Sequence, residues 1–301
     1  MKTWLGLLLI LWSALAGAET GRFAIVGDTP YSQFERRQFP KMLEAIADAQ
    51  VDLVAHIGDI KGGQQRCDDR LFEDRKALFN ASRIPFVYIP GDNEWTDCAR
   101  VTNGSYDPLE RLDKLRSLFW SGNHSLGQRQ IVVEQQPGYP EHARFRLGPV
   151  LFVTLNVPGP DNNWGMEDAP RQEFTARNPA LLAWMKEGFT LARKEKAPAI
   201  VLLMQANPGF KHFAQGLPNR GFRDLLETLR SETLDFPGQV LLVHGDTHHH
   251  QIDHPLRNGQ GETIERFTRV ESYGYPFMGW VKVYMDTDSP ALFRFESHPW
   301  P

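Results

Sequence analysis

The sequence predicts an α/β fold in which two mixed sheets pack face to face, with helices on their outer sides. In the N-terminal third, short apolar runs alternate with amphipathic segments of helical period. A β-α-β-α-β order of this kind predicts parallel strands joined by right-handed crossovers. Further short strand-like runs fill the middle and the C-terminal part, so a single small sheet does not accommodate them all.

The first elements are the most regular. Residues 22–27 form an apolar run that predicts a strand, and residues 34–49 predict a helix because Phe39, Met42 and Ile46 fall on one face. By the same reasoning, strands are expected at 53–57 and 86–89, and helices at 69–80 and 109–119.

Beyond residue 120 the pattern changes to short strands, interrupted by fewer helices. The dipeptide Gly148-Pro149 predicts a turn between two antiparallel strands. Helices at 179–195 and 222–230 precede apolar strands at 199–204 and 239–243. The other predicted strands are 131–134, 143–147, 150–157, 251–253, 264–270, 280–285 and 292–295.

The N-terminus is typical of an export signal. Lys2 precedes a short apolar stretch, and Ala16-Gly17-Ala18 is a small-residue cleavage site. The stretch is short for a membrane span, and a first core helix is the weaker alternative because the segment is apolar all round. We therefore expect residues 1–18 to be a signal peptide and 19–301 to be one domain that is exported, to the periplasm or the medium. No later segment predicts a transmembrane helix.

The net charge bears on the class of partner, and the two cysteines bear on how the fold is stabilised. The formal net charge of −4 argues against a nucleic-acid partner, which normally meets a basic face. Cys67 and Cys98 are the two cysteines of the sequence, and in an exported chain they predict a disulfide worth about 3 to 4 kcal/mol. Two free buried thiols are the alternative.

Five apolar runs end in acidic, amide or imidazole side chains. If these runs are parallel strands, their carboxyl ends bring the side chains to one edge, where α/β folds bind ligands. A single Gly-Asp after a strand is as readily a helix cap, but the repetition favours a shared site. The segments are Gly27-Asp28, Gly58-Asp59, Gly91-Asp92-Asn93-Glu94, Gln205-Ala206-Asn207-Pro208 and Gly245-Asp246-Thr247-His248.

The order and spacing of these motifs resemble the calcineurin-like metallophosphoesterase superfamily over about residues 22 to 250. The resemblance implies a four-layer α/β/β/α sandwich, two metal ions and hydrolysis of a phosphomonoester or phosphodiester by activated water. Asp28 and His248 correspond to ligands of the first metal, and Asp59 to the bridging carboxylate. Asp92, Gln205 and Asp246 stand where the family has the second-site ligands Asn, His and His.

Two other family imidazoles are replaced. Pro30 stands where the first motif has His, and Asn93 stands in place of the catalytic-loop His. Asn93 cannot act as a general acid, so activated esters or anhydrides are expected to react faster than alkyl monoesters. Because these imidazoles are lost, an alternative function is also open. The chain would then be a noncatalytic metal- or ligand-binding relative that keeps the scaffold. We expect Asp59, Asp92 and Asn93 to be the catalytic residues.

At the second site, each lost imidazole is replaced by an oxygen donor, Gln205 or Asp246. Four clustered carboxylates would repel unless cations neutralise them, which favours two divalent metal ions. An oxygen-rich set favours Mn²⁺ or Mg²⁺, with Ca²⁺ as an alternative and Zn²⁺ or iron disfavoured. The expected partner is a small phosphorylated substrate, and the sequence does not fix the oligomeric state.

Several neighbouring residues are candidates for supporting the ligands or contacting substrate. Each also has an ordinary structural explanation. A histidine can simply bond to neighbouring groups of its loop, and an arginine can be solvated at the surface. Trp95 and Trp164 are candidates for the rim of the site, with packing as the alternative. The supporting candidates are Glu94, Asn207, His244, His250, Arg66 and Arg100, together with His56.

Overall fold

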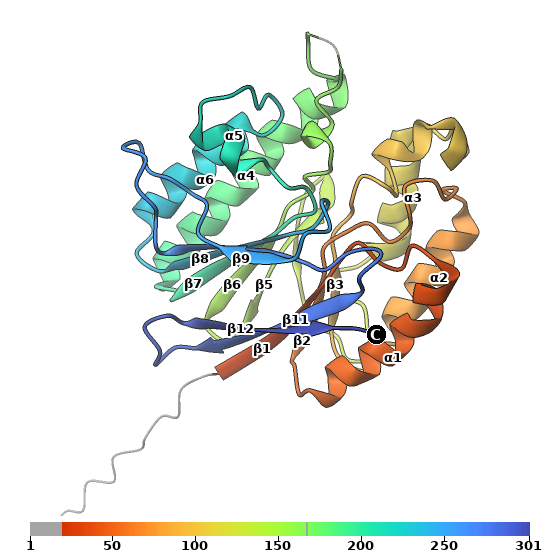
Figure 1. The fold of residues 1–301 in the computed structure, drawn as a ribbon, viewed down its shortest axis with the longest axis horizontal. Helices are drawn as coiled ribbons and strands as arrows, with labels where there is room; N and C mark the ends of the chain where they lie inside the picture. Colours follow the sequence, from red (N-terminus) through yellow and green to blue (C-terminus); the bar gives the residue numbers. More distant parts are fainter. Residues whose placement is uncertain (1–19, 167) are drawn as a thin grey trace, which may run out of the picture.

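The computed structural model describes residues 20–166 and 168–301. Its elements form four layers, α/β/β/α, with the two sheets facing each other in the middle (Figure 1). This is the predicted fold class. The expected signal peptide, residues 1–18, lies outside the described residues. None of the helices formed by the described residues has both the length and the apolar character that crossing a membrane requires.

One layer is a five-stranded sheet, counted over the described residues, in the order β12-β11-β1-β2-β3. Strands β1, β2 and β3 are parallel, whereas β11 runs antiparallel to both β1 and β12. The strands are β1 (Thr20–Val26), β2 (Leu53–His56), β3 (Phe86–Tyr88), β11 (Gly279–Asp286) and β12 (Phe293–Pro299).

The facing layer is a seven-stranded sheet of the described chain, in the order β4-β5-β6-β7-β8-β10-β9. Its central strands β6, β7, β8 and β10 are parallel, and the strands at both edges are antiparallel. The strands are β4 (Glu134–Gln136), β5 (Tyr139–Leu147), β6 (Val150–Thr154), β7 (Ala199–Leu203), β8 (Gln239–His244), β9 (Gln251–Asp253) and β10 (Phe267–Glu271).

Helices cover the outer side of each sheet. Figure 1 shows α1 and α2 beside the five-stranded sheet, and α4 and α6 beside the seven-stranded one. The α-helices are α1 (Gln33–Asp48), α2 (Asp69–Asn80), α3 (Pro108–Phe119), α4 (Gln172–Glu195), α5 (Phe210–Ala214) and α6 (Arg223–Asp235). Short 3-10 turns η1 (Thr96–Ala99), η2 (Val101–Asn103) and η3 (Asp161–Asn163) lie in the loops.

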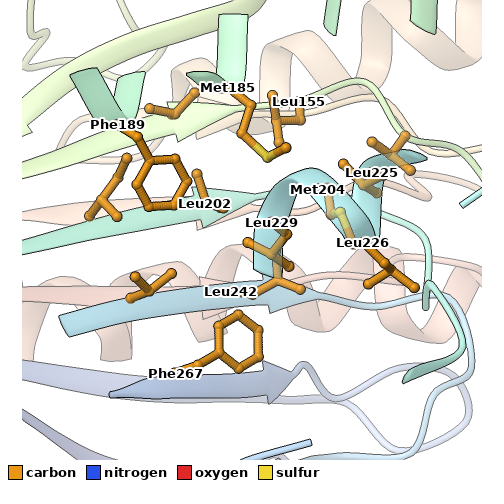
Figure 2. Close-up of a cluster of buried hydrophobic side chains, with 14 of the residues drawn as sticks. Leu155, Met185, Phe189, Leu202, Met204, Leu225, Leu226, Leu229, Leu242 and Phe267 are labelled. Carbon is orange, nitrogen blue, oxygen red and sulfur yellow. The ribbon is translucent and has the colours of Figure 1, made fainter. Parts of the chain in front are cut away.

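Alternating side chains of the strands build the core between the layers. In β6, Leu151 and Val153 face the outer helices, whereas Val150 and Phe152 face the other sheet. Both faces are therefore buried, which explains why the strands are continuously apolar in sequence. Figure 2 shows the outer cluster, where Leu202 of β7 and Leu242 of β8 lie near Phe189 of α4 and the leucines of α6.

The structure differs from the element predictions at several places. The predicted strand at 131–134 is wrong, because residues 131–133 bond to residues 123–125 in a local pairing and β4 begins at Glu134. Helix α4 begins at Gln172, before the expected start at Pro179, because its first turns bury Phe174 and Arg177. The short helix α5 was not predicted from the sequence pattern.

Candidate active site

The five motifs meet at one end of the two sheets. Asp28, Asp59 and Asp92 follow β1, β2 and β3, and Gln205 and Asp246 follow β7 and β8. Hydrogen bonds join the sheets here. The Asp246 amide N–H donates to Asp28 Oδ1 at 3.0 Å, and Gln205 Nε2 donates to Asp92 Oδ1 at 2.8 Å. The site is therefore shared by both sheets.

Four of the predicted ligands have left-handed backbone conformations. The φ angles are 51° at Asp28, 55° at Asp59, 78° at Asp246 and 58° at His248. Residues with a Cβ seldom adopt this region, and such strain concentrates at functional sites where the surrounding fold enforces it. Four of the six predicted ligands therefore share this uncommon backbone conformation, which also occurs elsewhere, for example at Gln50 and Lys196.

Two of the motif glycines allow the carboxylates to come this close to the backbone. A Cβ on Gly91 would fall on Asp59 Oδ1, and a Cβ on Gly245 would fall on Asp28 Oδ2. Glycine at these two positions is thus required by the packing of the acids, since neither has a left-handed backbone.

Asp59 lies at the centre of a hydrogen-bond network. Its Oδ2 accepts bonds from the Tyr31 hydroxyl and from Asn93 Nδ2, both at 2.9 Å, and its Oδ1 accepts from the Asn93 amide at 3.1 Å. The Tyr31 hydroxyl is also 3.4 Å from His248 Nε2. Tyr31 was not among the residues predicted from the sequence, because a single tyrosine in the loop after the first motif carries no distinguishing signal.

Asp28 and His248 form a second pair. Their Oδ1 and Nε2 atoms are 3.5 Å apart, and the Ser272 hydroxyl donates to Asp28 Oδ2 at 3.2 Å. His248 Nδ1 lies 2.7 Å from the Tyr275 carbonyl, which can only accept, so this nitrogen carries a proton. In the neutral ring, Nε2 then presents its lone pair towards Asp28 and Tyr31.

The second-site candidates are also linked. While Gln205 Nε2 donates to Asp92, Gln205 Oε1 accepts from the Gly159 amide at 2.7 Å. Asp246 Oδ2 accepts from the Asn207 amide at 3.0 Å. Gln205 therefore holds the Asp92 carboxylate, and Asn207 holds Asp246.

The acids are buried close to one another. Burial, followed by the negative charges of Asp92, Glu94, Asp28 and Asp246, raises the pKa of Asp59 well above its usual range. Burial and the Asp246 charge likewise raise the pKa of Asp92, and burial raises the pKa of Asp246 to about 6. Mutual repulsion of this kind is relieved by cations.

One buried cation already lies in this region. Lys61 is fully buried and donates to the Gly62 carbonyl at 3.2 Å. Burial lowers the pKa of its ammonium group, and the charges of Glu94, Asp59 and Asp97 oppose that shift. Lys61 was also missed from the sequence, where a single lysine after Gly58-Asp59 carries no distinguishing signal.

Glu94 organises the loops that carry Asp59 and Asp92. Its carboxylate accepts bonds from the Gly91 amide at 2.7 Å, the Asp59 amide at 3.1 Å and the Tyr88 hydroxyl at 2.7 Å. A single buried carboxylate thus fixes the start of both loops.

The supporting histidines make hydrogen bonds to backbone carbonyls and to a serine hydroxyl. His244 is buried, donates through Nδ1 to the Gly245 carbonyl, and its pKa is lowered by burial to about 4. His250 bonds to the Glu271 carbonyl and to the Ser297 hydroxyl. His56 Nε2 donates to the Thr29 carbonyl at 2.8 Å, next to the first motif.

The two arginine candidates are exposed and paired with acids, whereas the two tryptophan candidates differ in burial. Arg66 is paired with Asp68 at 3.2 Å, whereas Arg100 is paired with Asp97 beside the Asp92 loop. Trp95 is fully buried, so the rim position considered for it is wrong and the packing alternative is correct. Trp164 is partly exposed and packs against Phe174.

The structure joins Cys67 and Cys98 in a disulfide, with Cα atoms 5.8 Å apart. Both sulfur atoms lie near the Asn93 carbonyl, at 3.6 and 3.7 Å. The bridge therefore ties the chain that follows Asp59 to the chain that follows Asp92.

The oxygen and nitrogen donors of the site are of the kinds that bind a divalent cation. The side chains do not, however, converge on one point. Within residues 20–166 and 168–301, no group of three or more His, Cys, Asp and Glu side chains is arranged so that it could hold a metal ion. Close donors occur instead in pairs, Asp28 with His248 and Asp59 with Tyr31. Buried carboxylates with raised pKa values are the groups that a cation would neutralise.

Comparison with known proteins agrees with this fold. The calcineurin-like phosphoesterase family matches residues 21–251, and the chain belongs to this family. Metallophosphoesterases of this family generally use two divalent metal ions. Among curated proteins, no sequence match was found.

Two solved structures share the fold. A dimetal phosphatase from Danio rerio superposes with a TM-score of 0.60 at 13% identity, over 93% of this chain and 96% of that chain. The purple acid phosphatase PPD1 from yellow lupin (Lupinus luteus) seeds has a TM-score of 0.53 at 12% identity, over 92% of this chain and 53% of that chain. At these identities the likeness concerns the fold alone.

Proposed function

We propose that this chain is a metal-dependent hydrolase of a phosphomonoester or phosphodiester. The observation that carries the proposal is the meeting of Asp28, Asp59, Asp92 and Asp246 at one edge of two sheets, with left-handed backbone at three of them and at His248. Family membership supports phosphoesterase chemistry in general, and the specific reaction is our inference.

Asp28 and His248 would hold one cation, Asp59 would bridge, and Asp92, Gln205 and Asp246 would hold the other. When bound, two divalent cations supply the Lewis acidity that activates water and offsets the charge of the phosphoryl group. The oxygen-rich donor set favours Mn²⁺ or Mg²⁺, with Ca²⁺ as an alternative. Gln205 would have to turn its amide so that the oxygen faces the cation, which would break its bond to Asp92 and the bond that its oxygen accepts from the Gly159 amide.

The hydrogen-bond donors of the protein hold the acids in place. They do not provide an obvious proton for the leaving group. Tyr31 and Asn93 donate to Asp59 and fix its carboxylate. Asn93 cannot donate a proton to a leaving alkoxide, so good leaving groups should react fastest. The expected substrates are therefore activated esters or anhydrides of phosphate.

The test is turnover of 4-nitrophenyl phosphate, bis(4-nitrophenyl) phosphate and propyl phosphate, with Mn²⁺, Mg²⁺ or EDTA. We expect metal-dependent turnover that EDTA abolishes, with the aryl esters faster than propyl phosphate. Equal rates on aryl and alkyl esters would contradict the leaving-group argument.

A noncatalytic metal- or ligand-binding protein is the second candidate, and one observation favours it. The acids are satisfied by neighbouring donors, since Asp59 accepts three hydrogen bonds and Asp92 accepts one from Gln205. Calorimetry that shows Mn²⁺ binding without turnover of any of the three esters would establish this candidate.

We also propose that the chain is exported after cleavage behind Ala18 and that 19–301 is one domain. The supporting feature is the sequence of residues 1–18. N-terminal sequencing of protein expressed with this segment should begin at Glu19, and an intact Met1 in the mature protein would refute the proposal.

A further inference from the structure

A cavity of about 730 Å³ lies at the edge of the seven-stranded sheet that ends in β9. Its wall is built by the loop after β7, by α5, and by β9 with the loop that follows it. Its polar and charged lining includes Asn207, Lys211, Asp253, Arg257 and Arg269. Among the described residues that line the cavity, Asp253 is the one acid.

Asn207 connects this cavity to the candidate active site. Its backbone amide donates to Asp246 Oδ2 at 3.0 Å, and its Nδ2 donates to the Thr247 hydroxyl at 3.3 Å. A residue that lines the cavity thus bonds directly to a predicted metal ligand. Part of a substrate that reacts at the acids would therefore extend past Asn207 into the cavity.

The buried arginine of the wall is neutralised by the lining acid. Arg269 is 6% exposed, and its Nε and Nη2 atoms each donate to a different carboxylate oxygen of Asp253 at 2.6 Å. Arg269 Nη2 also donates to the Gln251 amide oxygen at 3.0 Å. This is a bidentate ion pair, so the charges of its two members cancel and neither is available to a ligand.

Two further cations of the wall have no acidic partner. Lys211 of α5 is exposed, and Arg257 after β9 is partly buried. Within residues 20–166 and 168–301, neither side chain forms an ion pair or a hydrogen bond. The lining acid Asp253 is already paired with Arg269. Over this part of the chain, the positive charges of Lys211 and Arg257 are therefore uncompensated.

The short helix α5 is fixed against the sheet beneath the cavity. The ring of Phe210 lies 5.6 Å from the ring of Phe267 in β10, and the guanidinium group of Arg269 lies 5.8 Å from the Phe210 ring. Asn207 Oδ1 accepts a bond from the Gly209 amide at 3.1 Å, which closes the turn before α5. A wall that is held in this way binds a ligand without the cost of ordering a loop.

We propose that this cavity binds a second phosphate group of the substrate through Lys211 and Arg257. A phosphate monoester carries a charge of about −1.5 to −2 near neutral pH, which two cations match. A lysine binds such a group as a point charge, and a guanidinium group binds two of its oxygens at once. The inference rests on the proposed function, because it assumes that a phosphoester reacts at the neighbouring acids. The substrate class is then a phosphoester with another phosphate group on the same molecule.

The experiment measures binding of alkylphosphonates, because hydrolysis of phosphoesters does not cleave their P–C bond. Propane-1,3-diylbisphosphonate and hexane-1,6-diylbisphosphonate are each compared with the monophosphonate of the same chain length. The two lengths cover different separations between the acids and the cavity. Calorimetry at a fixed free Mn²⁺ concentration gives the dissociation constants. The readout is the ratio of the two constants at each length, in which a general change of affinity at the acids cancels.

The variant under test is Lys211→Gln/Arg257→Gln, and its matched control is Lys194→Gln/Arg146→Gln, which also loses one lysine and one arginine. Both control positions are exposed. Arg146 lies next to the partner of Leu147 at the start of β6, and Lys194 is near the end of α4, shortly before β7 begins. The control therefore removes the same charge at the strand starts, whereas the acids follow the strand ends.

We expect the wild type to bind at least one bisphosphonate about 10- to 100-fold more tightly than its monophosphonate, as charge-assisted hydrogen bonds imply. Lys211→Gln/Arg257→Gln should lose this preference, and the control should keep it. No preference at either length in the wild type would overturn the inference. A preference that survives in Lys211→Gln/Arg257→Gln, or one that falls equally in the control, would overturn it as well.

The proposed hydrolase and the proposed phosphate site fail separately. A preference that depends on Lys211 and Arg257, in a protein that turns over none of the three test esters, would refute the hydrolase and support the phosphate site. Metal-dependent turnover of those esters without any preference for a bisphosphonate would support the hydrolase and refute the phosphate site.

Discussion

Asp59 is the residue in which backbone strain, burial and charge coincide. Its φ is 55°, it is 3% exposed, and four other acids raise its pKa. Keeping an ionised carboxylate in these surroundings lowers the stability of the fold. A bound cation would offset this loss. The role proposed for Asp59 can therefore be tested by stability as well as by activity.

We predict that Asp59→Asn abolishes stabilisation by Mn²⁺. Metal at about 100 times its dissociation constant should stabilise the wild type by about 2.7 kcal/mol, and the variant should gain little. Thermal unfolding with and without Mn²⁺ measures the difference. Asp235→Asn, an exposed position at the end of α6, is the matched control and should respond like the wild type. An equal response of Asp59→Asn would remove Asp59 from the metal site.

Tyr31→Phe tests the hydroxyl that contacts Asp59, Asn93 and His248. We expect kcat to fall about tenfold and the free energy of unfolding to fall by about 1 to 2 kcal/mol, because a hydrogen bond to a buried carboxylate is lost. Tyr275→Phe is the control, since its ring stacks on Tyr31 at 5.7 Å and keeps that contact. Unchanged kcat in Tyr31→Phe would show that the hydroxyl does not position Asp59 for the reaction.

The positions of the acids at the sheet edge could be predicted because each one directly follows an apolar run. Strand polarity alone then indicates that Asp28 and Asp59 end at the same edge. Tyr31 and Lys61 could not be predicted in this way. They reach the acids through loop conformation and side-chain direction, neither of which leaves a periodic pattern in the sequence.

Among the elements, the helices and strands whose apolar residues follow one clear period were predicted well. The predicted bounds of α2 and β9 agree with the structure, because each has a consistent pattern and polar residues beside it. The start of α4 was predicted too late, at Pro179. Proline is most common in the first turn of a helix, but here the chain N-terminal to it already packs through Phe174.

The loops that join β2 to α2 and β3 to α3 are held together by the disulfide of Cys67 and Cys98. We predict that the double variant Cys67→Ser/Cys98→Ser is less stable by about 3 to 4 kcal/mol, from the entropy of the opened chain. Urea unfolding of the wild type in the presence and absence of reductant provides an independent comparison. If neither change lowers the midpoint, the loops are held by their hydrogen bonds, such as that from the Cys67 amide to the Asn103 carbonyl.

The whole molecule places its chemistry between two sheets, so that the site exists only when both layers are folded. Asp28 follows a strand of one sheet and Asp246 a strand of the other, and the Asp246 amide donates to the Asp28 carboxylate at 3.0 Å. Ligands that bind the site should therefore stabilise the complete fold. Global stability also depends on buried ionisable groups elsewhere, and these contribute their own dependence on pH.

His142 of β5 is such a group, and the charges that act on it are those of Glu141, Arg177 and Arg116 and not those of the site acids. It is completely buried, its Nδ1 is 2.6 Å from Gln136 Oε1, and its ring stacks on Tyr139. Burial lowers its pKa to about 4. The charge of Glu141 opposes that shift, and the charges of Arg177 and Arg116 add to it. Glu141 is itself paired with Arg116 at 2.7 Å.

The sign of the pH effect follows from the lowered pKa of His142. Near pH 7.5 this histidine is neutral in both the folded and the unfolded chain, so its titration does not change the free energy of unfolding. As the pH falls from about 6.5 towards 4, the unfolded chain binds a proton that the folded chain excludes, so stability is lost. Between pH 7.5 and 5.5 the loss from this one residue should be about 1 to 1.5 kcal/mol.

We predict that His142→Asn removes this part of the pH dependence, since the amide does not titrate and can still bond to Gln136. Urea unfolding at pH 7.5 and 5.5 should show that the wild type loses about 1 to 1.5 kcal/mol more than the variant. Because the comparison is between two pH values, a constant destabilisation of the variant cancels, as do the contributions of the acidic edge. Parallel losses in both proteins would mean that His142 takes up its proton equally easily in the folded and the unfolded chain.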